Sequence, residues 1–203
     1  MRKSLFIIFV FTSILSSGQL KTFSIVPVAI DKKKFSHDSL DIIETYRFNH
    51  YTVTIGWTLE TPQKPKLLIT NRAGRVIYSK LGPNDSYFFR PTFFSADPTK
   101  DPTIILAETG SEYSWGNTVI EIHSDYAKRF GDLDVALFDT LDNISSNIAP
   151  ITKITTLNGS YFFNFKAYQV VYNPGGPKEK IFNGADISFI YKDGDLKLET
   201  HSR

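Results

Sequence analysis

Cysteine is absent from this chain of 203 residues. Disulfides, thiolate metal ligands and thiol nucleophiles are therefore excluded. An exported domain of this size does not need disulfides, because about 185 residues can bury a sufficient hydrophobic core without them. The sequence also lacks a phosphate-binding glycine loop and the G-x-S-x-G nucleophile elbow. These absences exclude thiol redox chemistry and the common nucleotide-binding motifs, and we expect no cofactor.

Long hydrophobic runs are almost as scarce. The longest, residues 5–15, follows two basic residues and precedes three small ones. This order is typical of a secretory signal, and the run is shorter than the roughly 20 apolar residues of a transmembrane helix. We therefore expect residues 1–18 to be a signal peptide, cleaved during export to the periplasm or the cell exterior. The alternatives are an uncleaved anchor and a buried first strand. Residues 19–203 are expected to form a single β-rich domain without an integral membrane segment.

An excess of charge of either sign is also missing. When Arg2 and Lys3 leave with the signal peptide, 21 basic residues stand against 21 acidic ones. The exported chain is then formally neutral with its histidines uncharged. Nucleic acids and anionic membranes are usually bound by a basic surface. We therefore expect no nucleic-acid partner.

Aromatic and β-branched residues are abundant instead. The chain has 17 Phe and 10 Tyr, and together with its Thr, Ile and Val residues this composition favours strands. In residues 51–59 every second side chain is apolar or aromatic, which predicts a strand with one buried face. About nine strands separated by turn signals predict an all-β fold, either an antiparallel β-sandwich or a small barrel. One or two short helices are compatible with this fold class.

The remaining elements are predicted from the same signals. Further strands are expected at residues 67–70, 76–79, 86–94, 103–108, 118–123, 133–138, 161–172, 187–192 and 195–199. Pro91 indicates an edge or a bend in its strand, and Asp193-Gly194 predicts a hairpin between the last two strands. Residues 38–47 are expected to form a short helix. For residues 124–130, a short helix and a hairpin turn are equal alternatives.

Metal-binding patterns are weak. His123 and Asp125 lie two residues apart, which on a strand would place both on one face. No second histidine stands at a recognisable spacing from them. Residues 131–137 resemble the end of the calcium-binding repeats of integrin-type β-propellers, but Lys128 and Arg129 stand where acidic ligands belong. We interpret these segments as a solvent-facing strand end and a turn into a strand, and expect no metal site.

One segment combines carboxylates with large aromatic side chains. Residues 108–117 contain Glu108, Glu112, Tyr113 and Trp115 among small residues. We expect an exposed loop in which the two rings contact a ligand and the acidic groups orient it. The alternative is that the rings fold back onto the sheet. A glycosidase would need the two carboxyl groups to converge beside such a sugar platform.

The sequence therefore predicts an exported binding or structural module for a protein or a glycan. A hydrolase acting on polysaccharide or peptide is the first alternative, and it requires a concave, acid-lined cleft. The second is an accessory subunit of an envelope complex that pairs through an exposed strand edge. The absence of catalytic signatures favours a role that is not enzymatic.

Overall fold

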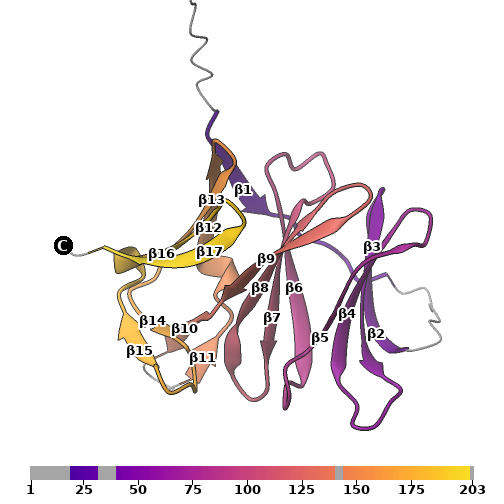
Figure 1. Cartoon of the computed structure of the whole chain (residues 1–203), viewed down its shortest axis with the longest axis horizontal. Coiled ribbons are helices and arrows are strands. Elements are labelled where there is room, and N and C mark those ends of the chain that lie inside the picture. Colours follow the sequence, from indigo (N-terminus) through magenta and orange to yellow (C-terminus); the bar gives the residue numbers. More distant parts are fainter. Residues whose placement is uncertain (1–18, 32–39, 140–143, 202–203) are drawn as a thin grey trace, which may run out of the picture.

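The computed structural model describes residues 19–31, 40–139 and 144–201, so the expected signal peptide lies outside the described residues. The described strands pair only antiparallel, and the two 3-10 turns have three residues each (Figure 1). The predicted all-β fold class is therefore confirmed. In the part of the chain that the structure describes, no helix is long and apolar enough to cross a membrane. The elements are β1 (Lys21–Ile25), β2 (Leu40–Arg47), β3 (Tyr51–Thr58), β4 (Pro65–Asn71), β5 (Val76–Leu81), β6 (Phe88–Ser95), β7 (Ile104–Gly110), β8 (Ser114–Ile122), β9 (Ala127–Leu133), β10 (Val135–Asp139), β11 (Ile144–Ser146), η1 (Ala149–Ile151), β12 (Thr152–Leu157), β13 (Ser160–Phe165), β14 (Val170–Tyr172), β15 (Lys180–Phe182), η2 (Gly184–Asp186), β16 (Ile187–Lys192) and β17 (Asp195–Thr200).

The strands form three sheets. Strands β2 to β5 make a four-stranded meander, and a second four-stranded sheet has the order β11-β10-β14-β15. The largest sheet has nine strands in the order β17-β16-β13-β12-β1-β6-β7-β8-β9. Strand β1 joins its two halves, because residues 21–23 pair with β12 and residues 24–25 pair with β6. The nine-stranded sheet curls until it is nearly closed, and Gly131 of β9 lies directly against the Leu196 side chain of β17.

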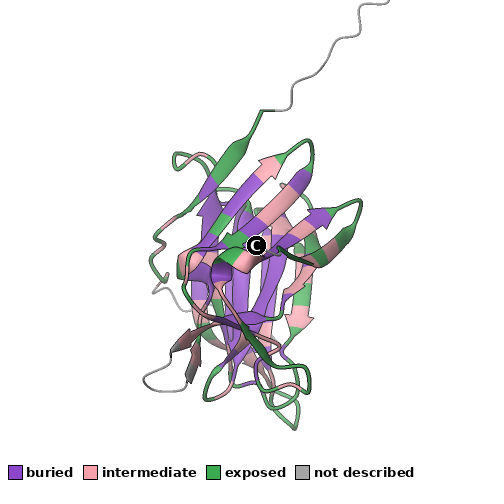
Figure 2. Ribbon diagram, turned by 90° about the vertical axis from the view of Figure 1, so that its left-hand side faces the viewer, coloured by how far each residue is buried: buried purple, intermediate pink, exposed green. Residues whose placement is uncertain are grey.

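Strands β6, β7 and β8 form a central layer that is buried on both faces. Successive side chains of a strand point to opposite faces, so Ile105 and Ala107 of β7 face the β2–β5 sheet while Ile104 and Leu106 face the rest of the curled sheet. Every residue of β7 is buried, and Figure 2 shows the buried residues concentrated in the strands at the middle of the molecule. The first core contains Tyr46, Tyr51, Val53, Ile55, Leu67, Ile69, Phe89, Phe93, Ile105, Ala107, Ile120 and Ile122. The second contains Phe23, Phe94, Ile104, Leu106, Val119, Phe130, Leu133, Val135, Ile148, Ala149, Ile154, Phe163, Phe165, Val170, Ile187, Phe189 and Tyr191.

The tight hairpins form where turn residues predict them. Between β16 and β17, Asp193 and Gly194 have φ angles of 53° and 90°. Two successive positive φ angles give the type I′ geometry that suits the twist of paired strands. Between β4 and β5 the Asn71 side chain accepts hydrogen bonds from the backbone N–H groups of Ala73 (3.1 Å) and Arg75 (3.0 Å), which fixes that turn.

The predicted helix at residues 38–47 is wrong. Its described part is strand β2, which pairs with β3 along its length. The register of this pair shifts between Ile42 and Glu44, so a bulge breaks the two-residue alternation. The three-residue spacing of Leu40, Ile43 and Tyr46 imitates the apolar stripe of a helix, but Ile43 is the bulged residue and is 54% exposed. Residues 38 and 39 lie outside the described residues.

Two other predicted strands differ from the structure, and the open alternative for residues 124–130 is resolved. Residues 161–172 are not one strand, because the chain leaves the large sheet after Phe165 and joins the β10 sheet at Val170. Residues 133–138 are likewise divided at Asp134, between β9 and β10. For residues 124–130 the hairpin turn is correct, since β9 begins at Ala127 and pairs with β8. Composition does not reveal such breaks, because both parts of each run remain apolar.

Candidate functional site

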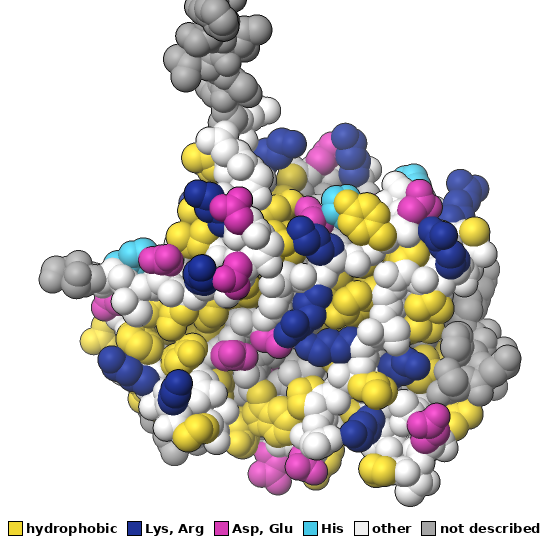
Figure 3. Space-filling model, in the orientation of Figure 1, with side chains coloured by type: hydrophobic (Ala, Val, Ile, Leu, Met, Phe, Trp, Pro, Cys, Tyr) yellow, Lys and Arg dark blue, Asp and Glu magenta, His cyan; other side chains and the backbone are white. Residues whose placement is uncertain are grey.

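The connections between strands gather at two ends of the molecule. In the view of Figure 1 the lower end carries the β3–β4 connection, the β5–β6 connection and the β7–β8 turn. The backbone N–H of Tyr87 donates to the carbonyl of Gly110 (2.7 Å), which ties the last two connections together. Figure 3 shows hydrophobic side chains gathered at this end below β6 to β8, with acidic side chains beside them. The predicted ligand-contacting segment lies here.

The expected long loop over residues 108–117 is wrong. Strand β7 continues to Gly110 and β8 begins at Ser114, so the turn consists of residues 111–113 alone. Glu108 pairs with Asn117 and both are buried. The register of the β7–β8 pair shifts next to Gly110, which places an extra residue, Trp115, opposite the end of β7. The small residues that suggested a loop belong to this irregular strand end.

The structure nevertheless brings three of the four predicted site residues to one cavity. The lower cavity has a volume of about 360 Å³, and Glu108, Glu112 and Tyr113 line it. Trp115 does not line it, but its ring packs edge-on against the Tyr113 ring, with centroids 6.4 Å apart. The other lining residues, which the sequence did not single out, are Phe88, Arg90, Ser111, Ser114, Ser145, Ser146 and Asn147.

Glu108 is the most unusual group of this cavity. Its side chain is only 4% exposed, and the nearest cation, Arg90, has its Nη1 atom 4.0 Å from Oε2 of Glu108. Burial raises the pKa of the Glu108 carboxyl, while the Ser114 hydroxyl and the Arg90 guanidinium oppose that shift. The Arg90 guanidinium in turn lies over the Phe88 ring, 4.0 Å from its centroid. Arg90 therefore lies at the cavity wall between the Phe88 ring and the Glu108 carboxylate, and it is 66% exposed.

Tyr113 and Glu112 form the outer rim. The Tyr113 hydroxyl lies against Gly175, which has a φ of 69° and no side chain to exclude the ring. Glu112 is exposed, and it has no hydrogen-bond or ion-pair partner among the described residues. The lower cavity thus presents one packed aromatic ring, one cation, one free carboxylate and several hydroxyl groups.

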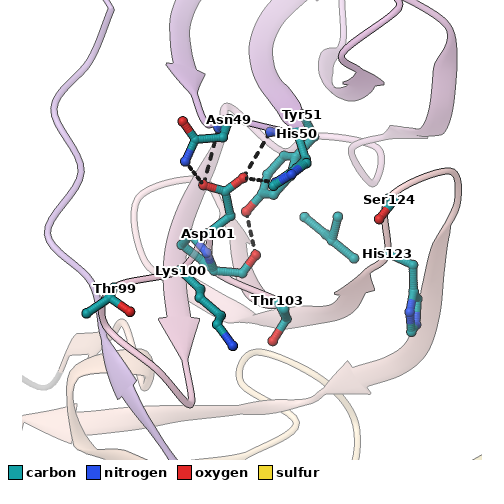
Figure 4. Close-up of a pocket in the computed structure, with 11 residues that line it drawn as sticks. Asn49, His50, Tyr51, Thr99, Lys100, Asp101, Thr103, His123 and Ser124 are labelled. Atoms are coloured by element: carbon teal, nitrogen blue, oxygen red, sulfur yellow. Dashed lines mark hydrogen bonds and ion pairs between the residues drawn. The ribbon is translucent and has the colours of Figure 1, made fainter.

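A different cavity at the upper end was not predicted from the sequence. It has a volume of about 470 Å³ and lies between the β2–β3 turn, the β6–β7 connection and the end of β8 (Figure 4). The Asp101 carboxylate accepts four hydrogen bonds there, from the backbone N–H groups of Asn49 (3.2 Å) and His50 (2.9 Å) and from their side chains (2.9 and 2.8 Å). The Tyr51 hydroxyl donates to the carbonyl of Pro102 (2.7 Å). These bonds fasten the turn of one sheet to the connection of the other.

The hydrogen bonds of Asp101 with Asn49 and His50, which will be called the upper clamp, have a structural role. Burial alone would raise the pKa of Asp101, but the hydrogen bonds from His50 and Asn49 outweigh burial and lower it. A catalytic triad would need a hydroxyl on the second ring nitrogen of His50, and none of the described residues hydrogen-bonds that atom. The side chain of His123 lies apart from Asp101 (Figure 4) and pairs with Glu121, whose Oε2 is 3.0 Å from Nε2 of His123. The carboxylates of Asp101 and Glu121 are thus both paired with other groups of the protein.

In the segments that resembled metal sites, the acidic side chains contact basic or hydroxyl side chains. The Asp132 carboxylate accepts hydrogen bonds from Lys80 (3.2 Å), Thr118 (2.6 Å) and Arg129. Cations on both sides of this carboxylate do not suit calcium, which needs six to eight oxygen ligands. Asp125 is 78% exposed and faces Arg75, at 3.9 Å. Among residues 19–31, 40–139 and 144–201 no group of three or more histidine or acidic side chains is placed to hold a metal ion.

Comparison of the chain with models of known protein families, with curated proteins and with solved structures finds no match. The geometry of the two ends is therefore the basis for a functional assignment.

Proposed function

We propose that this protein is an exported, non-catalytic glycan-binding module and that the lower cavity contacts the glycan. The observation that carries the proposal is the convergence of Glu112, Tyr113 and Arg90 on one cavity. Sugars present hydroxyl groups that both donate and accept hydrogen bonds, together with apolar ring faces. A guanidinium, a carboxylate, hydroxyls and an aromatic ring complement all of these features.

A glycan is favoured over a protein partner by the shape of the site. The cavity volume of about 360 Å³ falls within the range of about 300 to 1,000 Å³ typical of small-ligand sites. Protein partners bury broad surfaces instead, about 800 Å² on each side. The signal-like sequence at residues 1–18 supports export, where extracellular and envelope polysaccharides are available as ligands.

The test is direct titration of residues 19–203 with four hexasaccharides, namely cellohexaose, xylohexaose, chitohexaose and maltohexaose, by isothermal calorimetry. We expect at least one to bind, and the variants Arg90→Ala and Glu112→Gln to weaken that binding about tenfold or more, since hydrogen bonds to charged groups contribute about 1.5–3 kcal/mol. The matched controls are Arg72→Ala and Glu199→Gln, two exposed positions away from the cavity, which should bind as the wild type does. Binding by none of the four sugars, or equal binding by Arg90→Ala, would contradict the proposal.

One observation favours a second candidate function, a glycoside hydrolase. Glu108 and Glu112 line the same cavity, the chemistry uses a pair of carboxyl groups, and the buried one has a raised pKa. The same hexasaccharides, incubated with the protein and separated by chromatography, distinguish the two functions. A binding module returns them intact. A hydrolase shortens them, and both Glu108→Gln and Glu112→Gln then abolish the cleavage while keeping the fold.

A further inference from the structure

A second cavity lies at the same lower end, beside the β5–β6 connection. It has a volume of about 620 Å³ and will be called the Trp57 cavity. Trp57 comes from the end of β3 and is half-buried, whereas Tyr87 comes from the β5–β6 connection and is 63% exposed. An aromatic side chain that is this exposed gains little from folding. The remaining lining residues are Pro62, Gln63, Lys64, Pro83, Asn84, Asp85 and Ser86.

The polar groups of the Trp57 cavity are partly fixed and partly free. The Lys64 ammonium donates a hydrogen bond to Oδ1 of Asn84 (2.8 Å), which orients the amide and leaves its NH₂ group as a donor. Gln63 and Asp85 are exposed, and neither has a hydrogen-bond or ion-pair partner among the described residues. Two rings, two amides and one carboxylate therefore line this cavity, and only the Asn84 carbonyl oxygen among these amide and carboxylate groups has a partner within the described residues.

The two lower cavities share the chain segment that separates them. Tyr87 lines the Trp57 cavity, and the next residue, Phe88, lines the lower cavity beneath Arg90. Successive side chains of an extended chain point to opposite sides, so one short segment presents a ring to each cavity. The segment is held in place, because the Ser86 hydroxyl bonds the carbonyls of Phe88 and Gly110, both at 3.1 Å.

We propose that the Trp57 cavity is a second saccharide subsite, which takes the apolar face of a sugar ring between Trp57 and Tyr87. The amides of Gln63 and Asn84 and the carboxylate of Asp85 bind hydroxyl groups of that sugar. A linear oligosaccharide that crosses the Tyr87–Phe88 segment occupies both cavities. The inference rests on the proposed function for the class of ligand. It adds that the bound oligosaccharide spans both cavities and crosses the Tyr87–Phe88 segment.

The chain contains two tryptophans, and each reports on one cavity. In Trp115→Phe the only tryptophan is Trp57, in the second subsite. In Trp57→Phe the only one is Trp115, which packs on Tyr113 of the lower cavity. Titration with cellohexaose, xylohexaose, chitohexaose and maltohexaose should change the fluorescence of Trp57 in the Trp115→Phe protein. Adding Tyr87→Ala to that protein should weaken the response about tenfold or more, because exposed aromatic anchors dominate recognition surfaces. Tyr168→Ala is the control, since Tyr168 is 81% exposed and lines neither cavity.

The outcomes separate this inference from the proposed function. A Trp57 response that depends on Tyr87 supports the second subsite, whether or not Trp115 responds. If Trp115 responds to a sugar and Trp57 does not, the proposed function stands and the second subsite is wrong. A Trp57 response that Tyr87→Ala leaves unchanged also contradicts it, as does binding of a protein partner at Tyr87 in place of any of the sugars. If Trp115→Phe does not fold, Tyr87→Ala and Tyr168→Ala are made in the wild-type background and each is titrated calorimetrically with the four hexasaccharides. Weaker binding by Tyr87→Ala alone then supports the second subsite, and equal binding by both variants contradicts it.

Discussion

Asp101 lies in the connection that precedes strand β7 and Glu108 lies near the end of that strand, and the surroundings of the two carboxylates have opposite effects. Asp101, at the upper end, accepts four hydrogen bonds from Asn49 and His50. Glu108, at the lower end, is buried more deeply and faces Arg90 across 4.0 Å. The pKa of Asp101 is lowered because its hydrogen bonds outweigh its burial, and the pKa of Glu108 is raised by burial. The first carboxylate stabilises the fold, whereas the second costs stability at neutral pH.

The difference separates a structural contact from a candidate site. A carboxylate whose acceptors are all used within the chain has little left for a ligand, even when it lines a cavity. A buried acid with incomplete pairing persists at a cost, and such groups cluster at functional sites. The polar groups of the upper cavity are therefore used to connect two sheets. The lower cavity is smaller than the upper one, but it is the stronger candidate for recognition.

The largest expected effect is loss of the upper clamp. Replacing Asp101 with Ala leaves the backbone N–H groups of Asn49 and His50 without their acceptor. We expect the free energy of unfolding to fall by about 1.5–3 kcal/mol, the range for a hydrogen bond to a charged group. Urea unfolding at pH 7 measures this, with Asp195→Ala as the control, because the Asp195 carboxylate is 62% exposed and its pair with Lys197 lies at the surface. A change below about 0.5 kcal/mol in Asp101→Ala would show that the clamp is not structural.

The clamp also has a pH signature. Because the pKa of Asp101 is lower in the folded than in the unfolded protein, its contribution is present above the ordinary carboxyl pKa and is lost as the pH falls through the lowered value. The difference in stability between wild type and Asp101→Ala should therefore shrink in acid. An equal difference at pH 3 and pH 7 would mean that the charge of Asp101 has no part in it.

The effect at Glu108 is smaller and has the opposite sign. The raised pKa of Glu108 means that the folded protein holds this proton more tightly than the unfolded chain, so stability declines as the pH rises through the raised value. Glu108→Gln removes the charge and should increase the stability at pH 7 by up to about 1 kcal/mol, the size of one hydrogen bond. Thermal melts at pH 4 and pH 7 measure the change, which should be confined to the higher pH. A destabilised Glu108→Gln protein at pH 7 would indicate that the Arg90 pair is a net stabilising contact.

Much of the fold could be predicted from the sequence because its signals are local. The strand at residues 51–59 and the Asp193-Gly194 turn depend on neighbours along the chain, and both form in the structure. The predicted single buried face of that strand is only partly correct, because Thr54 is also buried while Leu59, beyond the end of β3, is 58% exposed. Pro91 lies where predicted, at a stretch of β6 beyond its pairing with β1. The helix predicted at residues 38–47 is wrong because Ile43, which completes the helix-like spacing, is an exposed bulge residue, and the sequence does not mark it as one.

The site was only partly predictable for a related reason. Glu108, Glu112 and Tyr113 stand close together in the sequence, so their chemistry could be seen as one group. Arg90 reaches Glu108 only through the pairing of β6 with β7, and the Asp101 clamp joins residues 51 positions apart. The placement of Trp57 and Tyr87 on one cavity likewise depends on how two sheets are connected. No local pattern encodes these contacts.

The most direct test of the account is backbone hydrogen exchange of residues 19–203, measured by mass spectrometry with and without the tightest-binding of the four hexasaccharides. We expect the sugar to slow exchange in the β5–β6 connection around Tyr87 and in the β7–β8 turn, residues 111–113, because these segments form the walls of the two lower cavities. The β2–β3 turn at Asn49 and His50 and the β6–β7 connection at Asp101 should exchange at the same rate in both samples. Protection of the upper clamp with no change at the lower end would contradict the assignment of recognition to the lower end.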